Sequence, residues 1–343
     1  MILTFKLKHN RNFTPELDKA FEVAEFVVKN KIKSPNTTFV KDIRGVLPSV
    51  IACQIMRKYG NQKNIKSVHS VNLIVPGREV KFFEETNSIW VPCLKLHLEN
   101  LIPYNFTKIN QMEIDNEYCY ISVTVPEESE MIPQNLIGVD RNTTGHIVVT
   151  ANLTTGQVRK MGKKALHIHK KYSNIRRKLQ FGGKYRKVKK IKDKESRIIL
   201  DLNHKISREL VNMAKIQNAV LVFEDLTGIR NTKKQNKSFR YSLHSWSFYQ
   251  LQQFVEYKAK LLGVPVLYVD PAYTSQDCSR CGSRGQRQGK AFICPICGHV
   301  NHADVNAAFN IALRQKDMIT CMQTKMYTMG TLISQNDALL EGE

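Results

Sequence analysis

The sequence predicts an α/β protein with two folded parts: a β-barrel that holds a small helical bundle, followed by a mixed α/β domain. The length of 343 residues is enough for two or three domains. Turn-bounded strand patterns dominate the chain before Leu136, whereas strands and helices alternate after it. The formal net charge of +22 is also divided unequally, since residues 1–136 contribute +2 and residues 137–343 contribute +20. We therefore expect the domain boundary between residues 136 and 137, with nearly all of the basic surface in the second domain.

The first domain begins with an alternating strand pattern over residues 1–8. A helical insert is expected over about 14–62, because Thr14 and Pro15 form a helix start and Gly60 a helix stop. Strand patterns then return, separated by Gly, Asn and Asp turns, at residues 71–75, 80–84, 88–98 and 118–125. We interpret this region as a helical bundle set into a β-barrel.

The second domain begins with three short strands in a meander, at residues 137–140, 146–153 and 157–161. A long basic helical region follows over 165–216, broken near Gly182 and Gly183. The continuous apolar run 219–223 is typical of a strand buried on both faces. A helix from Trp246 to 262 and a strand over 264–269 complete a mixed sheet.

Four cysteines form two Cys-x2-Cys pairs with twelve residues between them: Cys278, Cys281, Cys294 and Cys297. Two such knuckles can close a tetrahedral thiolate site around zinc, and four protein ligands leave no open position for catalysis. The alternative is a chance spacing of buried thiols. We expect a structural zinc ribbon over about 274–300, and we interpret Cys53, Cys93, Cys119 and Cys321 as buried thiols without a metal.

Three carboxylates lie where different predicted elements begin or end. Asp140 ends the first strand of the meander, Glu224 ends the apolar strand, and Asp304 opens a helix over 302–313. Two divalent metal ions about 4 Å apart need carboxylates that converge in this way from separate elements. Each acid also has a structural explanation, as a turn residue or a helix-starting acid. We interpret Asp225 and Asp270, which also follow strands, as structural.

The densest basic stretch, residues 159–192, contains fifteen Lys or Arg and no carboxylate. It predicts contacts with nucleic-acid phosphates, although a solvated helical face is the alternative. Aromatic residues interleave with these cations and could stack on bases or pack into the sheet: Tyr172, Phe181, Tyr185 and Phe239. The candidate phosphate contacts are Lys170, Lys171, Arg176, Arg177, Lys178, Lys184, Arg186, Lys187, Lys189 and Lys190. Four cations at the ribbon tip also suit phosphate contact, with a solvated charged loop as the alternative: Arg280, Arg284, Arg287 and Lys290.

Taken together, these motifs resemble the TnpB family of insertion-sequence proteins over about residues 136–315. The matching segments are Val139-Asp140 before a hairpin, Phe223-Glu224-Asp225-Leu226, Tyr268-Val269-Asp270-Pro271, the ribbon from Thr274 to Gly282, and Ala303-Asp304-Val305-Asn306. Arg197, Asp201, His204, Lys205 and Ser207 resemble the basic helix of the family, so Arg197 and Lys205 join the candidate nucleic-acid contacts. The sequence departs from the family at Arg141-Asn142, where a glycine is usual.

The resemblance implies a RuvC-like nuclease of the ribonuclease-H type over 137–315, with the zinc ribbon inserted before the last acid. It implies that Asp140, Glu224 and Asp304 bind catalytic Mg²⁺, two ions with Mn²⁺ as a substitute. It further implies that residues 1–136 form a wedge barrel with a recognition insert. The expected activity is RNA-guided hydrolysis of DNA, with guide RNA from the transposon end and double-stranded target DNA as partners. Two alternatives are a transposase that performs strand transfer and a guided DNA-binding repressor without nuclease activity.

Membrane insertion is not expected, because no apolar run approaches the ~18 to 20 residues of a membrane span. The charged start of the chain lacks the apolar core of a signal peptide. We expect a prokaryotic cytoplasmic protein that joins the nucleoid when bound to DNA. The polar tail, residues 316–343, is compatible with disorder.

Overall fold

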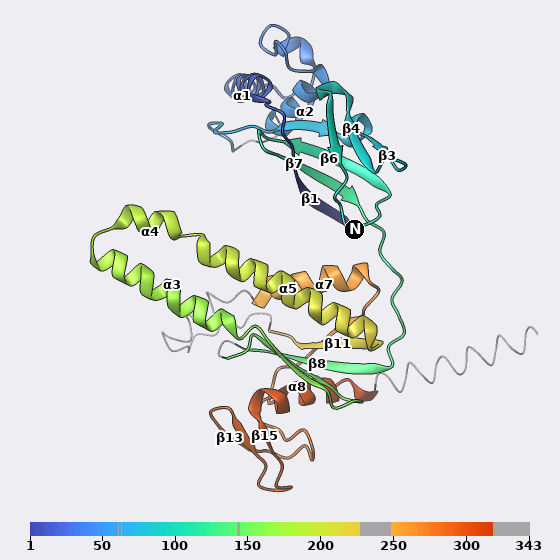
Figure 1. Ribbon diagram of the computed structural model, residues 1–343, viewed down its shortest axis with the longest axis vertical. Helices are drawn as coiled ribbons and strands as arrows, with labels where there is room; N and C mark the ends of the chain where they lie inside the picture. Colours follow the sequence, from blue (N-terminus) through green and yellow to red (C-terminus); the bar gives the residue numbers. More distant parts are fainter. Residues whose placement is uncertain (61, 63, 143–144, 227–247, 318–343) are drawn as a thin grey trace, which may run out of the picture. The chain divides into compact units, whose positions relative to one another are not determined.

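The computed structural model describes residues 1–60, 62, 64–142, 145–226 and 248–317. The chain divides into two compact units, Met1–Pro126 and Glu127–Glu343, which we call unit 1 and unit 2 (Figure 1). Several sequence predictions lie outside the described residues: Phe239, Trp246, Cys321 and nearly all of the tail 316–343. In the described part of the chain, no helix combines the length and the apolar character that crossing a bilayer requires.

The division between the units precedes the predicted boundary, because the connecting segment already belongs to unit 2. Lys215 Nζ lies 2.8 Å from a Glu128 carboxylate oxygen. The Met131 N–H donates to the Gly263 carbonyl at 2.8 Å. The segment before β8 is therefore anchored to unit 2 without forming a strand there.

The described residues of unit 1 form two helices and seven strands. They are β1 (Ile2–Lys8), α1 (Thr14–Lys29), α2 (Ser49–Gly60), β2 (Leu73–Pro76), β3 (Lys81–Phe83), β4 (Ser88–Val91), β5 (Leu96–Glu99), β6 (Lys108–Ile114) and β7 (Tyr118–Thr124), with short 3-10 turns η1 (Thr37–Val40), η2 (Gly77–Glu79) and η3 (Pro92–Leu94). The buried residues of α1 recur at helical spacing, at Ala20, Val23, Ala24 and Val27. This stripe packs on α2, which in turn packs on β2.

The strands of unit 1 form two antiparallel sheets, with the orders β1-β7-β6-β2 and β3-β4-β5. The expected barrel is therefore two separately hydrogen-bonded sheets in the described residues. The strand expected over 88–98 is divided in two, because Pro92 begins a 3-10 turn and Lys95 adopts a left-handed conformation at φ +47°. One strand, β6, was absent from the sequence prediction.

Unit 2 is built around one five-stranded mixed sheet. Its elements are β8 (Asn135–Arg141), β9 (Val148–Asn152), β10 (Val158–Met161), α3 (Lys164–Phe181), α4 (Tyr185–Ile191), α5 (Lys194–Ile216), β11 (Ala219–Glu224), α7 (Phe248–Leu261), β12 (Val266–Val269), β13 (Gln286–Gln288), β14 (Ala291–Ile293), β15 (Val300–His302) and α8 (Ala303–Leu313). The strand order is β10-β9-β8-β11-β12. The first three strands are antiparallel, and β11 runs parallel to both β8 and β12. The predicted meander and the predicted mixed sheet are thus both present.

Helices cover both faces of this sheet (Figure 1). On one face, Leu210 of α5 and Val255 of α7 pack with Phe223 of β11. On the other face, Ile311 of α8 packs with Val222. Each residue of β11 is buried, which explains why the strand is apolar without alternation.

The approach of α8 to β8 depends on a glycine. A Cβ atom at Gly138 would lie 1.9 Å from the carbonyl oxygen of Ala308, far inside van der Waals contact. Only glycine therefore lets the backbone of α8 lie this close to β8. Because Asp304 lies in the first turn of α8 and Asp140 lies two residues after Gly138, this contact also affects how the two acids are placed.

Candidate active site and cysteine ribbon

Asp140 lies near the end of β8 and is 7% exposed. The amide of Asn142 donates to its carboxylate at 2.6 Å. Burial, together with the charges of Glu224 and Asp304, raises the pKa of Asp140 to about 7, although Asn142 and Lys290 act in the opposite direction. Asp140 therefore shares its electrostatic environment with both of the other predicted acids.

Glu224 is the last residue of β11 and is 9% exposed. The parallel register pairs Phe223 with Val139, so the next residues, Glu224 and Asp140, lie side by side at the carboxyl ends of their strands. The hydroxyl of Thr274 donates to Glu224. Burial raises the pKa of Glu224, while Thr274, Arg141 and Arg314 act in the opposite direction.

Asp304 lies in the first turn of α8 and is 1% exposed. Its carboxylate contacts two cations of the ribbon, Lys290 Nζ at 2.6 Å and Arg287 Nη2 at 3.4 Å. His302 caps the helix by accepting the Asp304 N–H at 3.3 Å. The sequence left open whether these two ribbon-tip cations contact phosphate or lie in a solvated loop, and in the structure both contact the third acid.

Arg141 is a site residue whose role the sequence prediction missed. It is 6% exposed and directly follows Asp140. Its guanidinium donates to the Glu224 carbonyl at 2.6 Å and to the Gln252 side chain at 2.9 Å. It thereby joins the ends of β8 and β11 to α7, which no local sequence pattern indicates.

The three acids offer only oxygen ligands, which are the donors that Mg²⁺ and Mn²⁺ prefer. Burial and the two acidic neighbours disfavour the charged form of Asp140, as its raised pKa indicates, and a divalent cation would stabilise that charged form. The residues present therefore fit such a cation. Their oxygens are more widely spaced than in a closed site, because within the described ranges only the four cysteines bring three or more metal-ligating atoms within 4.8 Å of one another.

The four cysteines meet as predicted in one cluster. The Sγ atoms of Cys278 and Cys297 lie 3.7 Å apart, and those of Cys281 and Cys294 lie 3.6 Å apart. These separations exceed a disulfide bond and approach the ~3.8 Å edge of a tetrahedron with Zn–S bonds of about 2.3 Å. The sheet β13-β14-β15 and the buried ring of Phe292 support the cluster. The geometry therefore suits one tetrahedral metal ion.

The basic stretch forms the hairpin of α3 and α4, and its candidate contacts have two kinds of environment. Arg176 pairs with the buried carboxylate of Glu195, and Lys205 pairs with Asp201 at 2.7 Å. The remaining candidates are exposed: Lys170, Lys171, Arg177, Lys178, Lys184, Arg186, Lys187, Lys189, Lys190 and Arg197. Arg176 therefore has a structural contact, while the exposed cations are accessible to a ligand.

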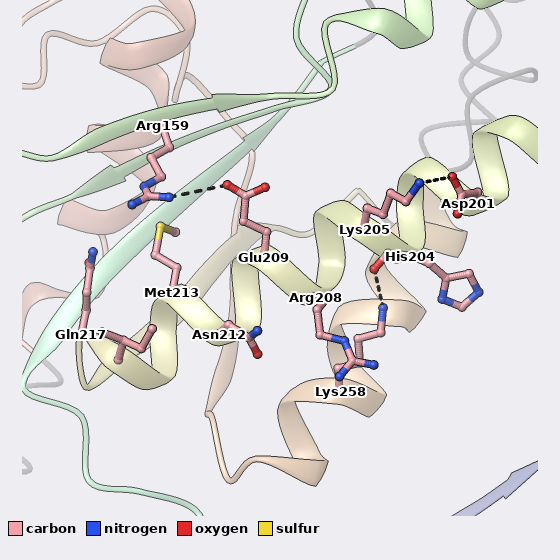
Figure 2. A pocket seen from close by; sticks show the side chains of 11 residues that line it. Arg159, Asp201, His204, Lys205, Arg208, Glu209, Asn212, Met213, Gln217 and Lys258 are labelled. Atoms are coloured by element: carbon pink, nitrogen blue, oxygen red, sulfur yellow. Dashed lines mark hydrogen bonds and ion pairs between the residues drawn. The ribbon is translucent and has the colours of Figure 1, made fainter. Parts of the chain in front are cut away.

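A groove of about 870 Å³ runs along the outer face of α5, with one wall from α7 (Figure 2). Lys258 lies at its base, where the ammonium donates to the His204 carbonyl at 2.8 Å and also to Ser207. Burial, together with the charge of Arg208, lowers the pKa of Lys258 to about 8. Lys258 thus links α5 to α7, and its ammonium is occupied by these protein contacts.

Comparisons with known proteins agree on one family. Residues 248–311 match the family model for the Cas12f1-like TNB domain. The chain is 30% identical over 271 residues to the TnpB-like protein MJ0751 of Methanocaldococcus jannaschii, covering 73% of this chain and 87% of that protein. It is 39% identical over 142 residues to the CRISPR-associated endodeoxyribonuclease Cas12f1 of Sulfoacidibacillus thermotolerans, covering 40% of this chain and 32% of that one.

Among solved structures, a cryo-EM structure of a Cas12f1–sgRNA–target DNA complex aligns over 91% of this chain and 99% of the other chain, with 19% identity and a TM-score of 0.45. The match to MJ0751 covers most of both sequences. The chain therefore belongs to the TnpB family.

Proposed function

We propose that this protein is an RNA-guided, metal-dependent DNA endonuclease. The observation that carries the proposal is the grouping of Asp140, Glu224 and Asp304, three buried acids from separate elements that interact electrostatically at one edge of the sheet. Relatives named as endodeoxyribonucleases, and the relative named as a putative RNA-guided DNA endonuclease in Escherichia coli, support the class of reaction. The order of the five strands, with helices on both faces, also suits a RuvC-like fold of the ribonuclease-H type.

In this proposal the three carboxylates hold two Mg²⁺ ions, which supply Lewis-acid activation of water and stabilisation of the leaving oxygen. The protein groups around them fix the ligands. The Thr274 hydroxyl orients Glu224, and the Asn142 amide orients Asp140. Arg141 holds the backbone of Glu224 in place. Lys290 and Arg287 keep positive charge beside Asp304, where a DNA phosphate would approach.

In this proposal the ribbon holds a structural zinc ion and contributes to the acid site by positioning residues. It places Lys290 and Arg287 against Asp304, and its last strand, β15, leads directly into α8. Partners are a guide RNA from the transposon end and a double-stranded DNA target. The protein would hold the RNA–DNA heteroduplex by contacts with the sugar-phosphate backbone of the nucleic acids. Sequence recognition would be left to base pairing.

The proposal is tested by incubating the purified protein with guide RNA, target DNA and Mg²⁺. Cut ends with a 5′ phosphate and a 3′ hydroxyl support an endonuclease, joined products indicate a transposase, and binding without cleavage indicates a repressor. Glu224→Gln should abolish cleavage while retaining RNA binding. Asp225→Asn is the matched control, because Asp225 is the neighbouring acid but is exposed, and it should cut like the parent protein. Equal cleavage by the parent protein and Glu224→Gln would refute the site assignment.

A further inference from the structure

The turn between α3 and α4 presents two aromatic side chains to solvent. Phe181, the last residue of α3, is 96% exposed, and Tyr185, the first residue of α4, is 68% exposed. The sequence left open whether these rings pack into the sheet or face a ligand. The structure excludes packing for both rings, whereas Tyr172 on the same hairpin is half-buried.

The backbone of this turn is well defined. The Gly183 N–H donates to the Gln180 carbonyl at 3.0 Å, and the Lys184 N–H donates to the Leu179 carbonyl at 2.8 Å. With Gly183 at φ +68°, these bonds form a Schellman motif that ends α3. The aromatic rings therefore extend from a hydrogen-bonded turn, which lowers the entropic cost of holding them in place for a ligand.

The base of the hairpin is fixed to the rest of unit 2. Glu195 of α5 is 8% exposed, and its carboxylate contacts both His169 and Arg176 of α3. Because one buried acid is shared by two side chains of α3, the hairpin is braced against α5. The turn between α3 and α4 is thus exposed, while the hairpin that carries it is anchored to α5.

The charge around the tip indicates the chemistry of its ligand. Lys178, Lys184, Arg186 and Lys187 are all exposed and flank the two rings, and no carboxylate lies between residues 159 and 192. An apolar protein groove would leave these cations without counter-charges. A membrane-binding helix needs a continuous apolar face, and the seven residues of α4 include four cations. A nucleic acid offers both a flat ring to stack on and phosphates on either side.

Stacking on aromatic rings favours RNA over duplex DNA. A base can stack on a side chain only when it is unpaired or lies at a helix end, and folded RNA presents such bases in loops and bulges. Duplex DNA keeps its bases stacked on one another.

We propose that Phe181 and Tyr185 form a stacking platform for an unpaired or terminal base of the guide RNA, with Lys178, Lys184 and Arg186 contacting the flanking phosphates. This inference rests on the proposed function, because it takes the guide RNA as the ligand.

The test measures RNA affinity in the Glu224→Gln background, so that DNA cleavage does not interfere. The probe is the RNA that copurifies with the protein. The double variant Phe181→Ala, Tyr185→Ala should bind it about 5-fold to 150-fold more weakly at fixed salt, since stacking on one base is worth about 1–3 kcal/mol. Phe181→Trp with Tyr185 intact should bind like the parent. Phe83→Ala is the matched control, because Phe83 is a 45% exposed ring in unit 1, and it should leave affinity unchanged.

The salt dependence separates stacking from charge. The aromatic double variant should keep the slope of log affinity against log salt, since no cation is removed. Lys184→Gln should instead lower the slope by about one. Ultraviolet crosslinking should attach RNA to a peptide that contains residue 181 or 185. Circular dichroism and thermal melting show whether the exposed substitutions leave the fold intact.

Each other outcome overturns the inference in a distinguishable way. Unchanged RNA affinity in the aromatic double variant refutes the platform and leaves the proposed function standing if the parent protein still cuts guided DNA. A selective loss of affinity for single-stranded DNA assigns the tip to the opened target instead. Binding of the parent, but not the double variant, to vesicles of anionic phospholipid would indicate a membrane contact. Absence of RNA binding by the parent protein refutes the proposed function itself.

Discussion

Two cation-rich regions of unit 2 contain the same residue types in opposite environments. At the ribbon, Lys290 and Arg287 lie against Asp304, a carboxylate that is 1% exposed. On the α3–α4 hairpin, the exposed cations have no acid between residues 159 and 192. A cation beside a buried acid is held in place and is weakly screened by salt, whereas a cation on an exposed helix is mobile and salt-sensitive. The first arrangement suits a reaction site and the second suits a long polyanion.

The largest effect is expected when the ribbon loses its metal. Cys294→Ser removes a buried ligand, so zinc content should fall from about one ion per chain towards zero and the ribbon should lose its fold. Lys290 and Arg287 would then leave Asp304, and cleavage should fall below detection, while RNA binding by the hairpin persists. Elemental analysis measures the zinc content, and a filter-binding assay measures the RNA affinity. Cys93→Ser, at a half-buried lone cysteine, is the control and should keep its zinc.

A second test removes charge from the acid site. Asp140→Asn should abolish cleavage yet stabilise the metal-free fold at pH 8, by at most about 4 kcal/mol. The sign follows from the raised pKa of about 7. The native state holds the proton more tightly than the unfolded state, so this carboxyl lowers stability progressively as pH rises from about 4 to 7. Urea unfolding in the presence of a chelator, at pH 5 and pH 8, measures the difference in unfolding free energy between Asp140→Asn and the parent protein. A larger gain in stability at pH 5 than at pH 8 would contradict the prediction.

Gly138→Ala should disturb the acid site through the backbone. The new Cβ would meet the Ala308 carbonyl, so α8 must shift and carry Asp304 away from Asp140. We expect a loss of about 1–3 kcal/mol in unfolding free energy together with weaker cleavage. Gly182→Ala is the control, because its nearest neighbour would lie at an ordinary 3.5 Å and its φ is negative. Equal melting temperatures for both variants would show that β8 tolerates the extra atom.

Lys290→Gln removes one of the two ribbon cations that contact Asp304. Loss of the 2.6 Å ion pair leaves Asp304 with less compensation, and the Lys290 side chain is 36% exposed, so the cost is expected at about 1–2 kcal/mol. Cleavage should weaken, and the salt dependence of RNA binding should not change. A reduced salt slope in this variant would place Lys290 among the nucleic-acid contacts instead.

Lys187→Gln is the corresponding change on the hairpin and should have the smallest effect. We expect RNA affinity to fall by less than about tenfold, with a salt slope lowered by about one. Thermal stability should be unaffected, because the residue is exposed. Titrations at several salt concentrations measure the RNA affinity and its salt dependence. An altered rate of cleavage at saturating RNA would contradict the distinction between the ribbon and the α3–α4 hairpin.

The sequence predicted most elements of unit 2 because its patterns are local. The meander, the buried strand β11 and the two glycines after α3 each follow from residues close together in the chain. Unit 1 was harder. The strand β6 was missed because its polar residues and the register shift between Ile109 and Gln111 obscure the alternation. The split between β4 and β5 depends on a left-handed Lys95, a residue type with no preference for that conformation.

The candidate site shows the same limit. The residue types and positions of the acids and cysteines could be predicted, since each belongs to a local motif. The pairing of Lys290 with Asp304 could not, because it depends on where the ribbon folds back against α8. The role of Arg141 also required the structure, since its partners are Glu224 and Gln252 on two other elements.

The order of elements along the chain has a consequence during synthesis on the ribosome. The strands that carry Asp140 and Glu224 emerge first, and Asp304 follows only after the cysteine ribbon. Chains fold from the N-terminal end as they are made, so the third acid can join the others only when the ribbon has left the exit tunnel. A nascent chain that is stalled or cut before β15 carries an incomplete set of acids. The proposed cutting centre is thereby assembled last, when the α3–α4 hairpin, the proposed RNA contact, is already outside the ribosome.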